Sequence, residues 1–151
     1  MSTPIRLQYL ELKQRYPDTI LFFRLGDFYE TFDDDAKLVA AELQITLTSK
    51  PMGKDLRVPL AGVPYHSIDA HVAKLVGRGY RVAICEQMAD PAEVKGIVPR
   101  DVVRVVTAGT VTADASLDAA APNYLAALAV RGNDTALALA DITTGEVRLA
   151  S

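Results

Sequence analysis

The chain has 151 residues, of which 50% are hydrophobic, and a formal net charge of −3. This length and composition suit one complete domain with part of a second, and they exclude an extended disordered chain. The apolar runs are short and interrupted by charged residues, so we expect no membrane span, no signal peptide and a cytoplasmic location.

The first half of the chain predicts two helices and several strands. Thr3 and Pro4 suit the N-cap and first position of a helix, which Tyr16-Pro17 ends. The segment TILFFRL (19–25) predicts a strand, and a second helix follows with an apolar stripe from Phe32 to Leu43. The next segments predict a strand, an exposed loop, and a short strand with a turn: QITLT (44–48), SKPMGKDLR (49–57) and RVPLAGVPYH (57–66).

The second half predicts one more helix and then mainly strands. We expect Ser67 to cap this helix and Gly77-Arg78-Gly79 to end it. The remaining segments predict two strands with a short helical turn between them, and then three apolar strands: YRVAICEQ (80–87), ADPAEVKG (89–96), DVVRVVT (101–107), NYLAALAV (123–130), TALALADI (135–142) and EVRLAS (146–151).

Together these elements predict an α/β fold with two domains. We expect a mixed sheet flanked by about three helices in residues 1–111. Small residues, Ala and Asp fill 112–122, which predicts a linker. Residues 123–151 are expected to be the first strands of a second, truncated α/β domain.

The charge is unevenly distributed along the chain. Basic and acidic residues balance through residue 110, so the acidic excess lies in residues 111–151. Between Lys50 and Arg104 basic residues are in mild excess, far from the strong basic stripe of a typical non-specific DNA-binding protein. Any contact with a phosphate backbone would therefore not depend on bulk charge.

Residues 21–35, LFFRLGDFYETFDDD, contain every phenylalanine of the chain and three consecutive aspartates. Tyr29 and Phe32 share one side of a helix, whereas in an extended strand Phe28 and Glu30 share one side and Tyr29 takes the other. With Tyr29 and Phe32 buried, Phe28 is left pointing away from the core, beside Glu30. Gly26-Asp27 supplies a turn that would project this pair, and an exposed ring of this kind indicates a binding surface.

The acidic run has two interpretations. Asp33, Asp34 and Asp35 fall in the first turn of the second helix, where carboxylates cap free N–H groups and complement the helix dipole. The alternative is a metal-dependent phosphohydrolase whose carboxylates are Asp27, Glu30 and Asp33–Asp35. A third hypothesis is a protein-interaction module with Phe28 as anchor in a partner's groove.

Cysteine and histidine give little support to metal or redox chemistry. Cys85 is the only cysteine and lies in an apolar run, which predicts a buried, reduced thiol. His66 and His71 are close in sequence, but no carboxylate or thiol nearby completes a metal site, so structural roles are favoured.

Four segments, in this order along the chain, resemble one protein family: RLGDFYETFDDDA (24–36), VPLAGVPYHSIDAHVAKLVGRGYRVAICEQ (58–87), DPAEVKG (90–96) and VVRVVTAGT (102–110). They are similar to the amino-terminal mismatch-recognition domain of the MutS family of DNA mismatch repair, and the likeness covers nearly all of residues 3–111. NYLAAL and ALADITTGEV resemble the opening of that family's connector domain, which assigns residues 123–151.

The resemblance implies a function for the exposed pair. In that family the Phe of a Phe-x-Glu motif stacks on a mispaired or unpaired base from the minor groove, and the Glu hydrogen-bonds to the same base. Phe28 and Glu30 match the motif. Stacking tolerates any base, because every base has a π face. We hypothesise that Glu30 accepts from a pyrimidine as a carboxylate, and that nearby phosphates and desolvation favour its protonated form beside a purine.

Three basic residues are candidates for contacts to the DNA backbone: Lys50, Lys54 and Arg57. Lys50 falls where the resemblance places a basic residue. The surrounding loop departs most from the family pattern, and a solvated surface loop is the alternative for all three residues.

The resemblance also defines what this chain is expected to lack. No GxxxxGK[ST] occurs, so we expect a non-catalytic domain without cofactor or metal site of its own. For full-length members it implies an ATPase that uses ATP and Mg²⁺, a homodimer, a MutL partner and a nucleoid-associated location without a membrane. The expected ligand is double-stranded DNA with mismatches or small loops.

Overall fold

A computed structural model describes residues 3–90, 92, 94–108 and 123–150. The chain divides into two compact units, Met1–Val106 and Thr107–Ser151. The predicted linker (112–122) lies outside the described residues, as does part of ADPAEVKG (89–96). Within the described ranges, none of the helices has both the length and the apolar character needed to cross a membrane.

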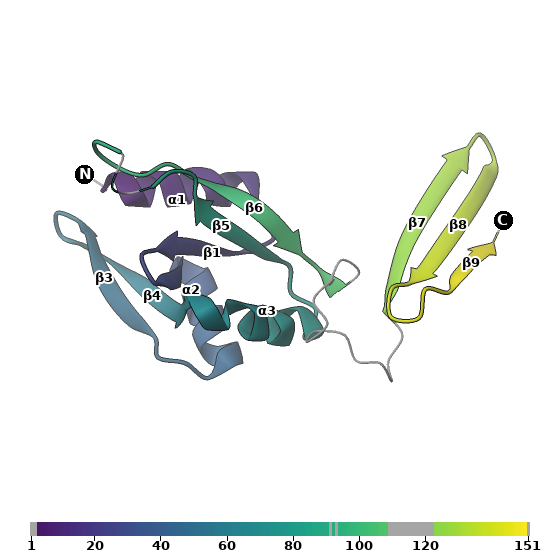
Figure 1. The fold of residues 1–151 in the computed structure, drawn as a ribbon, viewed down its shortest axis with the longest axis horizontal. Coiled ribbons are helices and arrows are strands. Elements are labelled where there is room, and N and C mark those ends of the chain that lie inside the picture. Colours follow the sequence, from purple (N-terminus) through teal and green to yellow (C-terminus); the bar gives the residue numbers. More distant parts are fainter. Residues whose placement is uncertain (1–2, 91, 93, 109–122, 151) are drawn as a thin grey trace. The chain divides into compact units, whose positions relative to one another are not determined.

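The first unit is built on a six-stranded mixed sheet (Figure 1). Its strands follow the spatial order β3-β4-β2-β1-β5-β6. β1 and β5 are parallel, and the other neighbours are antiparallel. The strand bounds are β1 Ile20–Leu25, β2 Phe28–Phe32, β3 Thr48–Gly53, β4 Leu56–Pro64, β5 Val82–Gln87 and β6 Arg100–Val106.

Helices cover both faces of this sheet. α1 (Pro4–Arg15) packs on one face, and α2 (Asp33–Leu43) and α3 (Ile68–Gly77) pack on the other (Figure 1). A short 3₁₀ turn, η1 (Tyr65–Ser67), precedes α3. The predicted mixed sheet with three helices is therefore confirmed for the residues that the structure describes.

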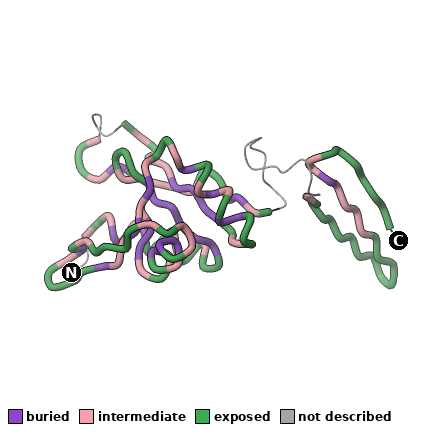
Figure 2. The backbone as a smooth tube through the Cα atoms, turned by 90° about the horizontal axis from the view of Figure 1, so that it is seen from below, coloured by how far each residue is buried: buried purple, intermediate pink, exposed green. Residues whose placement is uncertain are grey.

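The hydrophobic core has two layers because the sheet is covered on both sides. Under α1 the core includes Tyr9, Phe23 and Phe32, and the ring of Tyr9 meets each of the two phenylalanine rings edge to face. Successive residues of a strand point to opposite faces, so Phe22 and Phe23 are both completely buried in β1. Figure 2 shows the buried backbone concentrated in the centre of the sheet and along the inner sides of the helices.

Local chemistry explains where the elements begin and end. Thr3 caps α1 by accepting a hydrogen bond from the backbone N–H of Arg6 (3.4 Å). Gly26 has a φ of 59° in the turn between β1 and β2, a conformation that glycine adopts without strain. Asp33 has a φ of 56°, and because Asp tolerates this left-handed region, β2 passes directly into α2.

Two neighbouring segments around β3 differ from the sequence predictions. In the segment predicted as a strand at 44–48, Gln44 is instead the C-cap of α2, and only Thr48 belongs to a strand, as the first residue of β3. Most of the predicted exposed loop belongs to β3 and to the β3–β4 hairpin. Pro51 misled the prediction, because β3 is an edge strand and edge strands tolerate proline.

The second unit is an antiparallel sheet with the order β7-β8-β9. Its strands are β7 Tyr124–Arg131, β8 Asp134–Asp141 and β9 Val147–Ala150, close to the three predicted apolar strands. Many of its apolar side chains are exposed, including Leu128 and Leu149. Asp141 is buried at the β8–β9 turn, where it accepts hydrogen bonds from Asn123, Thr143 and Thr144.

Candidate nucleic-acid interface

Phe28 is the first residue of β2, directly after the Gly26-Asp27 turn. Its side chain is 47% exposed, whereas Phe32 at the other end of the strand is 1% exposed. Both rings lie on the α1 face of the sheet, because residues 28, 30 and 32 of an extended strand point the same way. The prediction that Phe28 stands outside the core is confirmed.

The helical interpretation of this stretch is wrong. Phe28–Phe32 is a strand, so Tyr29 and Phe32 lie on opposite faces of the sheet. Both are nevertheless buried, because α1 covers one face, and α2 and α3 cover the other. Burial of Tyr29 and Phe32 therefore did not require a shared side, and the extended alternative correctly placed Phe28 beside Glu30.

Glu30 lies two residues after Phe28 on the same face, and its carboxylate is paired. Lys50 of β3 donates to both carboxylate oxygens, at 3.0 Å and 3.3 Å. The Glu30 side chain is only 15% exposed, and that of Lys50 is 42% exposed. A carboxylate with so little contact with water requires such a partner, because burial of an unpaired charge is costly.

The other two basic candidates lie on the β3–β4 hairpin without contacting Glu30. Lys54 is exposed in the turn of the hairpin. Arg57 is exposed and donates to the hydroxyl (3.1 Å) and carbonyl (3.0 Å) of Ser49. Of the three predicted basic residues, the structure therefore brings only Lys50 to the Phe28–Glu30 pair.

A second group of rings, which the sequence analysis missed, lies at the same end of the sheet. The Arg24 guanidinium stands over Tyr65, 4.4 Å from its ring centroid, and over Tyr29 at 5.2 Å. Tyr29 donates to Glu86, and burial together with this hydrogen bond raises the pKa of Tyr29 to about 12. Tyr65 is itself 47% exposed. These residues come from four different segments, so no spacing in the sequence indicates the cluster.

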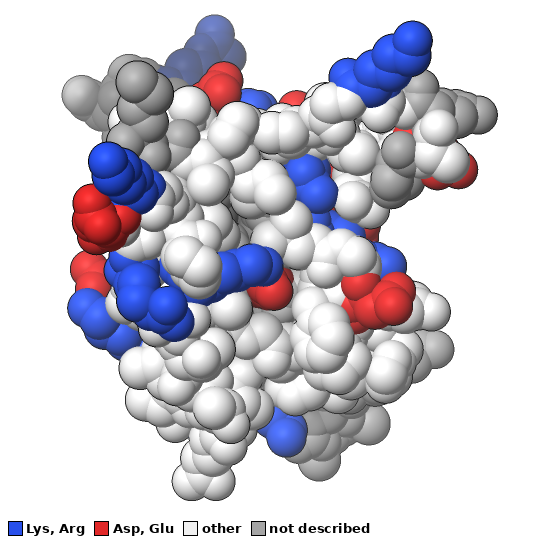
Figure 3. Space-filling view, turned by 90° about the vertical axis from the view of Figure 1, so that its left-hand side faces the viewer, with Lys and Arg blue, Asp and Glu red and all other residues white. Residues whose placement is uncertain are grey.

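Figure 3 views the first unit from the side toward which the β3–β4 hairpin points in Figure 1. Most of this face is uncharged, and Lys and Arg side chains occupy more of it than Asp and Glu.

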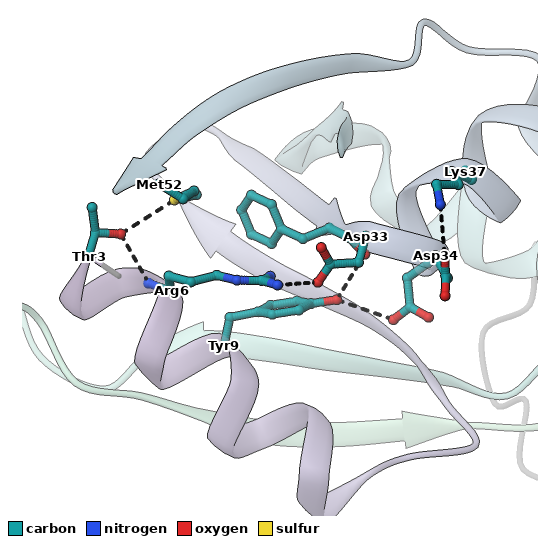
Figure 4. Close-up of polar contacts among 9 residues, drawn as sticks. Thr3, Arg6, Tyr9, Asp33, Asp34, Lys37 and Met52 are labelled. Carbon is teal, nitrogen blue, oxygen red and sulfur yellow. Dashed lines mark hydrogen bonds and ion pairs between the residues drawn. The ribbon is translucent and has the colours of Figure 1, made fainter. Parts of the chain in front are cut away.

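The aspartate run lies in the first turn of α2, as predicted, but Asp33 and Asp34 are engaged in ion pairs. Asp33 pairs with Arg6 of α1, and Asp34 pairs with Lys37 at 2.9 Å (Figure 4). The N-cap residue Phe32 makes no side-chain capping bond. Asp33 thus holds α2 to α1, whereas the pair of Asp34 with Lys37 lies within α2.

Asp35 is the most strongly bound of the three aspartates. It accepts from Lys13 (2.9 Å), from the backbone N–H of Leu21 (3.0 Å) and from the Tyr9 hydroxyl (3.4 Å). Burial and the nearby Asp35 carboxylate raise the pKa of Tyr9 well above its usual range. Asp35 lies on α2, and it therefore connects this helix to both α1 and β1.

These contacts do not support the phosphohydrolase alternative. In the described part of the chain, no three His, Cys, Asp or Glu side chains form a group that could hold a metal ion. His71 binds the backbone carbonyl of Ser67 (2.8 Å), and the ring of His66 packs edge-on against Tyr65. Burial raises the pKa of the Cys85 thiol to about 12, as suits the predicted buried thiol.

The fold and the site define an α/β domain that presents an exposed aromatic ring and a paired carboxylate on one strand beside a hairpin turn. The family described as MutS domain I matches residues 3–115. The chain belongs to this family.

Curated relatives of this chain are also MutS proteins. The chain is 54% identical over 144 residues to the DNA mismatch repair protein MutS of Dehalococcoides mccartyi, which covers 95% of this chain. It is 54% identical over 146 residues to the protein of that name from Symbiobacterium thermophilum and 56% over 144 residues to the one from Pelotomaculum thermopropionicum. In each case the matched segment is 17% of the relative's length.

Proposed function

We propose that this chain recognises mispaired or unpaired bases in double-stranded DNA, as the non-catalytic first part of a DNA mismatch repair protein. The observation that carries the proposal is the exposed ring of Phe28 next to Glu30 on one strand, in a member of the MutS domain I family. A single aromatic residue, outside the core and directly after a turn, suits insertion into a base stack.

Phe28 enters from the minor groove and stacks on the mispaired base, while Glu30 hydrogen-bonds to that base. Bending the DNA costs about 1–6 kcal/mol, and one aromatic stack returns about 1–3 kcal/mol. Insertion at a well-paired step is therefore unfavourable or nearly balanced. A mispaired step is easier to unstack, and each 1.4 kcal/mol saved is about tenfold in affinity. Selectivity therefore comes from how easily the DNA deforms at the mispaired step. It does not require the protein to read a particular base sequence.

The relatives are about six times longer than the matched segment, so the rest of the activity belongs to the full-length protein. We expect that protein to bind ATP and Mg²⁺, to act as a homodimer, to recruit MutL and to work in the cytoplasm on the nucleoid. Lys54 and Arg57 are proposed to contact phosphates near the mismatch. The roles of the full-length protein follow from the family resemblance, whereas Lys54 and Arg57 are included because they are exposed basic residues of the β3–β4 hairpin.

The test is DNA binding by a full-length MutS in which this chain replaces the matching segment. Fluorescence anisotropy compares a G·T duplex, a duplex with one unpaired thymidine and a fully paired duplex. Phe28→Ala is expected to remove the preference for the first two, and Phe28→Trp to retain it, because indole also stacks.

The matched control is Leu7→Ala, which removes an apolar side chain of similar exposure from α1. We expect it to leave the preference unchanged. Full discrimination by Phe28→Ala would contradict the proposal and would favour Phe28 as an anchor for a protein partner.

A further inference from the structure

The contact between Lys50 and Glu30 joins two strands that are not neighbours. Glu30 lies on β2, Lys50 lies on β3, and β4 runs between them. Along β4, Gly62 is the partner of Glu30 and Val58 is the partner of Lys50. The lysine side chain therefore has to cross β4 to reach the carboxylate.

Gly62 keeps the space beside Glu30 open. A Cβ atom at this position would lie 3.4 Å from Cγ of Glu30 and 3.3 Å from the carbonyl oxygen of Tyr29. Because Gly62 has no side chain, the Glu30 side chain can lie close against β4 on the side from which Lys50 reaches it.

The pair has an electrostatic consequence for DNA binding. A carboxylate that enters a minor groove faces a polyanion, and Glu30 is too shielded from water for solvent to screen its charge fully. Lys50 touches both oxygens and stays 42% exposed, so it cancels this charge at the place where DNA approaches. It also fixes the direction of the carboxylate next to Phe28.

We propose that Lys50 is a positioning residue that acts through Glu30: it neutralises and orients the carboxylate, so that Glu30 can be brought to a base. This inference rests on the proposed function. It differs from the expectation that Lys50 simply binds a phosphate, because a phosphate ligand would act whether or not residue 30 carries a charge.

A double-mutant cycle separates these two roles. The four proteins are the unchanged chain, Lys50→Met, Glu30→Gln and the double variant, each placed in the full-length background described above. With Glu30 present, Lys50→Met is expected to weaken binding to the G·T duplex by about fivefold or more, because it leaves a shielded, unpaired carboxylate beside the DNA. In the Glu30→Gln background the same change is expected to cost less than about twofold, because the amide needs no counter-charge.

Two further variants serve as controls. Lys50→Arg keeps the charge and is expected to restore most of the affinity lost in Lys50→Met. Lys37→Met removes an exposed lysine that pairs with Asp34 on α2, outside the site, and is expected to leave binding unchanged. Thermal unfolding of each variant checks that the fold is retained.

An equal loss in both backgrounds, with the salt dependence of binding reduced by about one ion each time, would overturn the inference in favour of a phosphate contact. No loss in either background would also overturn it. The proposed function fails separately, through Phe28→Ala: if that variant loses discrimination while the cycle is additive, only the role of Lys50 is wrong.

Discussion

The two ends of β2 carry the same kinds of residue in different surroundings. At one end Phe32 is buried against Tyr9, and the aspartates that follow are bound to α1, α2 and β1. At the other end Phe28 is exposed, and the Glu30 carboxylate is paired with a partly exposed lysine. Both rings lie on the same face of the sheet, so coverage by α1 decides which one stabilises the fold and which one is free to bind.

The largest expected effect concerns the two rings. Phe32→Ala should lower the free energy of unfolding by about 3–5 kcal/mol, because it empties a fully packed position. Phe28→Ala should lower it by less than about 1 kcal/mol, because the ring is largely in water. Urea denaturation of both variants measures the difference. Equal losses would mean that Phe28 is part of the core after all.

A smaller effect is expected within the aspartate run. Asp35→Ala should destabilise the protein by about 2–4 kcal/mol, because it leaves the Leu21 N–H without an acceptor and leaves Lys13 with only the Thr19 carbonyl and no counter-charge. Asp34→Ala should have no measurable effect, because its pair with Lys37 is exposed. The same urea titration tests this ranking. A large loss in Asp34→Ala would show that the run acts mainly by capping α2.

The smallest effect concerns two tyrosines, Tyr29 and Tyr9, each of which lies near one end of β2. Tyr29 is bound to Glu86 and Tyr9 to Asp35, and burial is the main reason that both pKa values are raised. A raised pKa favours the folded state below pH 10, and this contribution falls as pH rises from 10 toward 12. Ultraviolet absorbance of phenolate should show Tyr29 ionising near pH 12 and Tyr9 only at still higher pH or on unfolding. Tyr29→Phe identifies the first signal, and ionisation of Tyr29 near pH 10 would contradict the burial of its hydroxyl.

The sequence was sufficient to predict the α/β class, all three helices and the exposure of Phe28. Apolar periodicity and the Gly26-Asp27 turn carry those predictions, because they act over a few neighbouring residues. The same local reasoning left residues 28–32 open between an extended strand and the beginning of α2, since Phe32 continues the helical stripe of Ala36 and Val39. The pattern could not decide between them because the strand is covered on both faces and shows no clear alternation.

The contacts of the site could not be predicted in this way. The Glu30–Lys50 pair depends on the registers of β2 and β3 against β4, and the contact of Arg24 with Tyr65 depends on the end of β4 lying beside the β1–β2 turn. Both join residues far apart in sequence. The sequence analysis placed Lys50 in a loop, whereas it lies in β3. Because a loop has no strand register, Lys50 could not be paired with a position on β2.

The turn that carries Phe28 is short and is held at its base. It joins two paired strands, and the carbonyl of Asp27 accepts a hydrogen bond from the backbone N–H of Tyr65 at 2.9 Å. A ring mounted on so stiff a support has little conformational entropy to lose on association, which in the proposed function would leave more of its stacking energy for distorting the duplex. Unlike a disordered segment that folds on its target, the Phe28 ring is already in position, so in the proposed function the DNA would be the partner that bends.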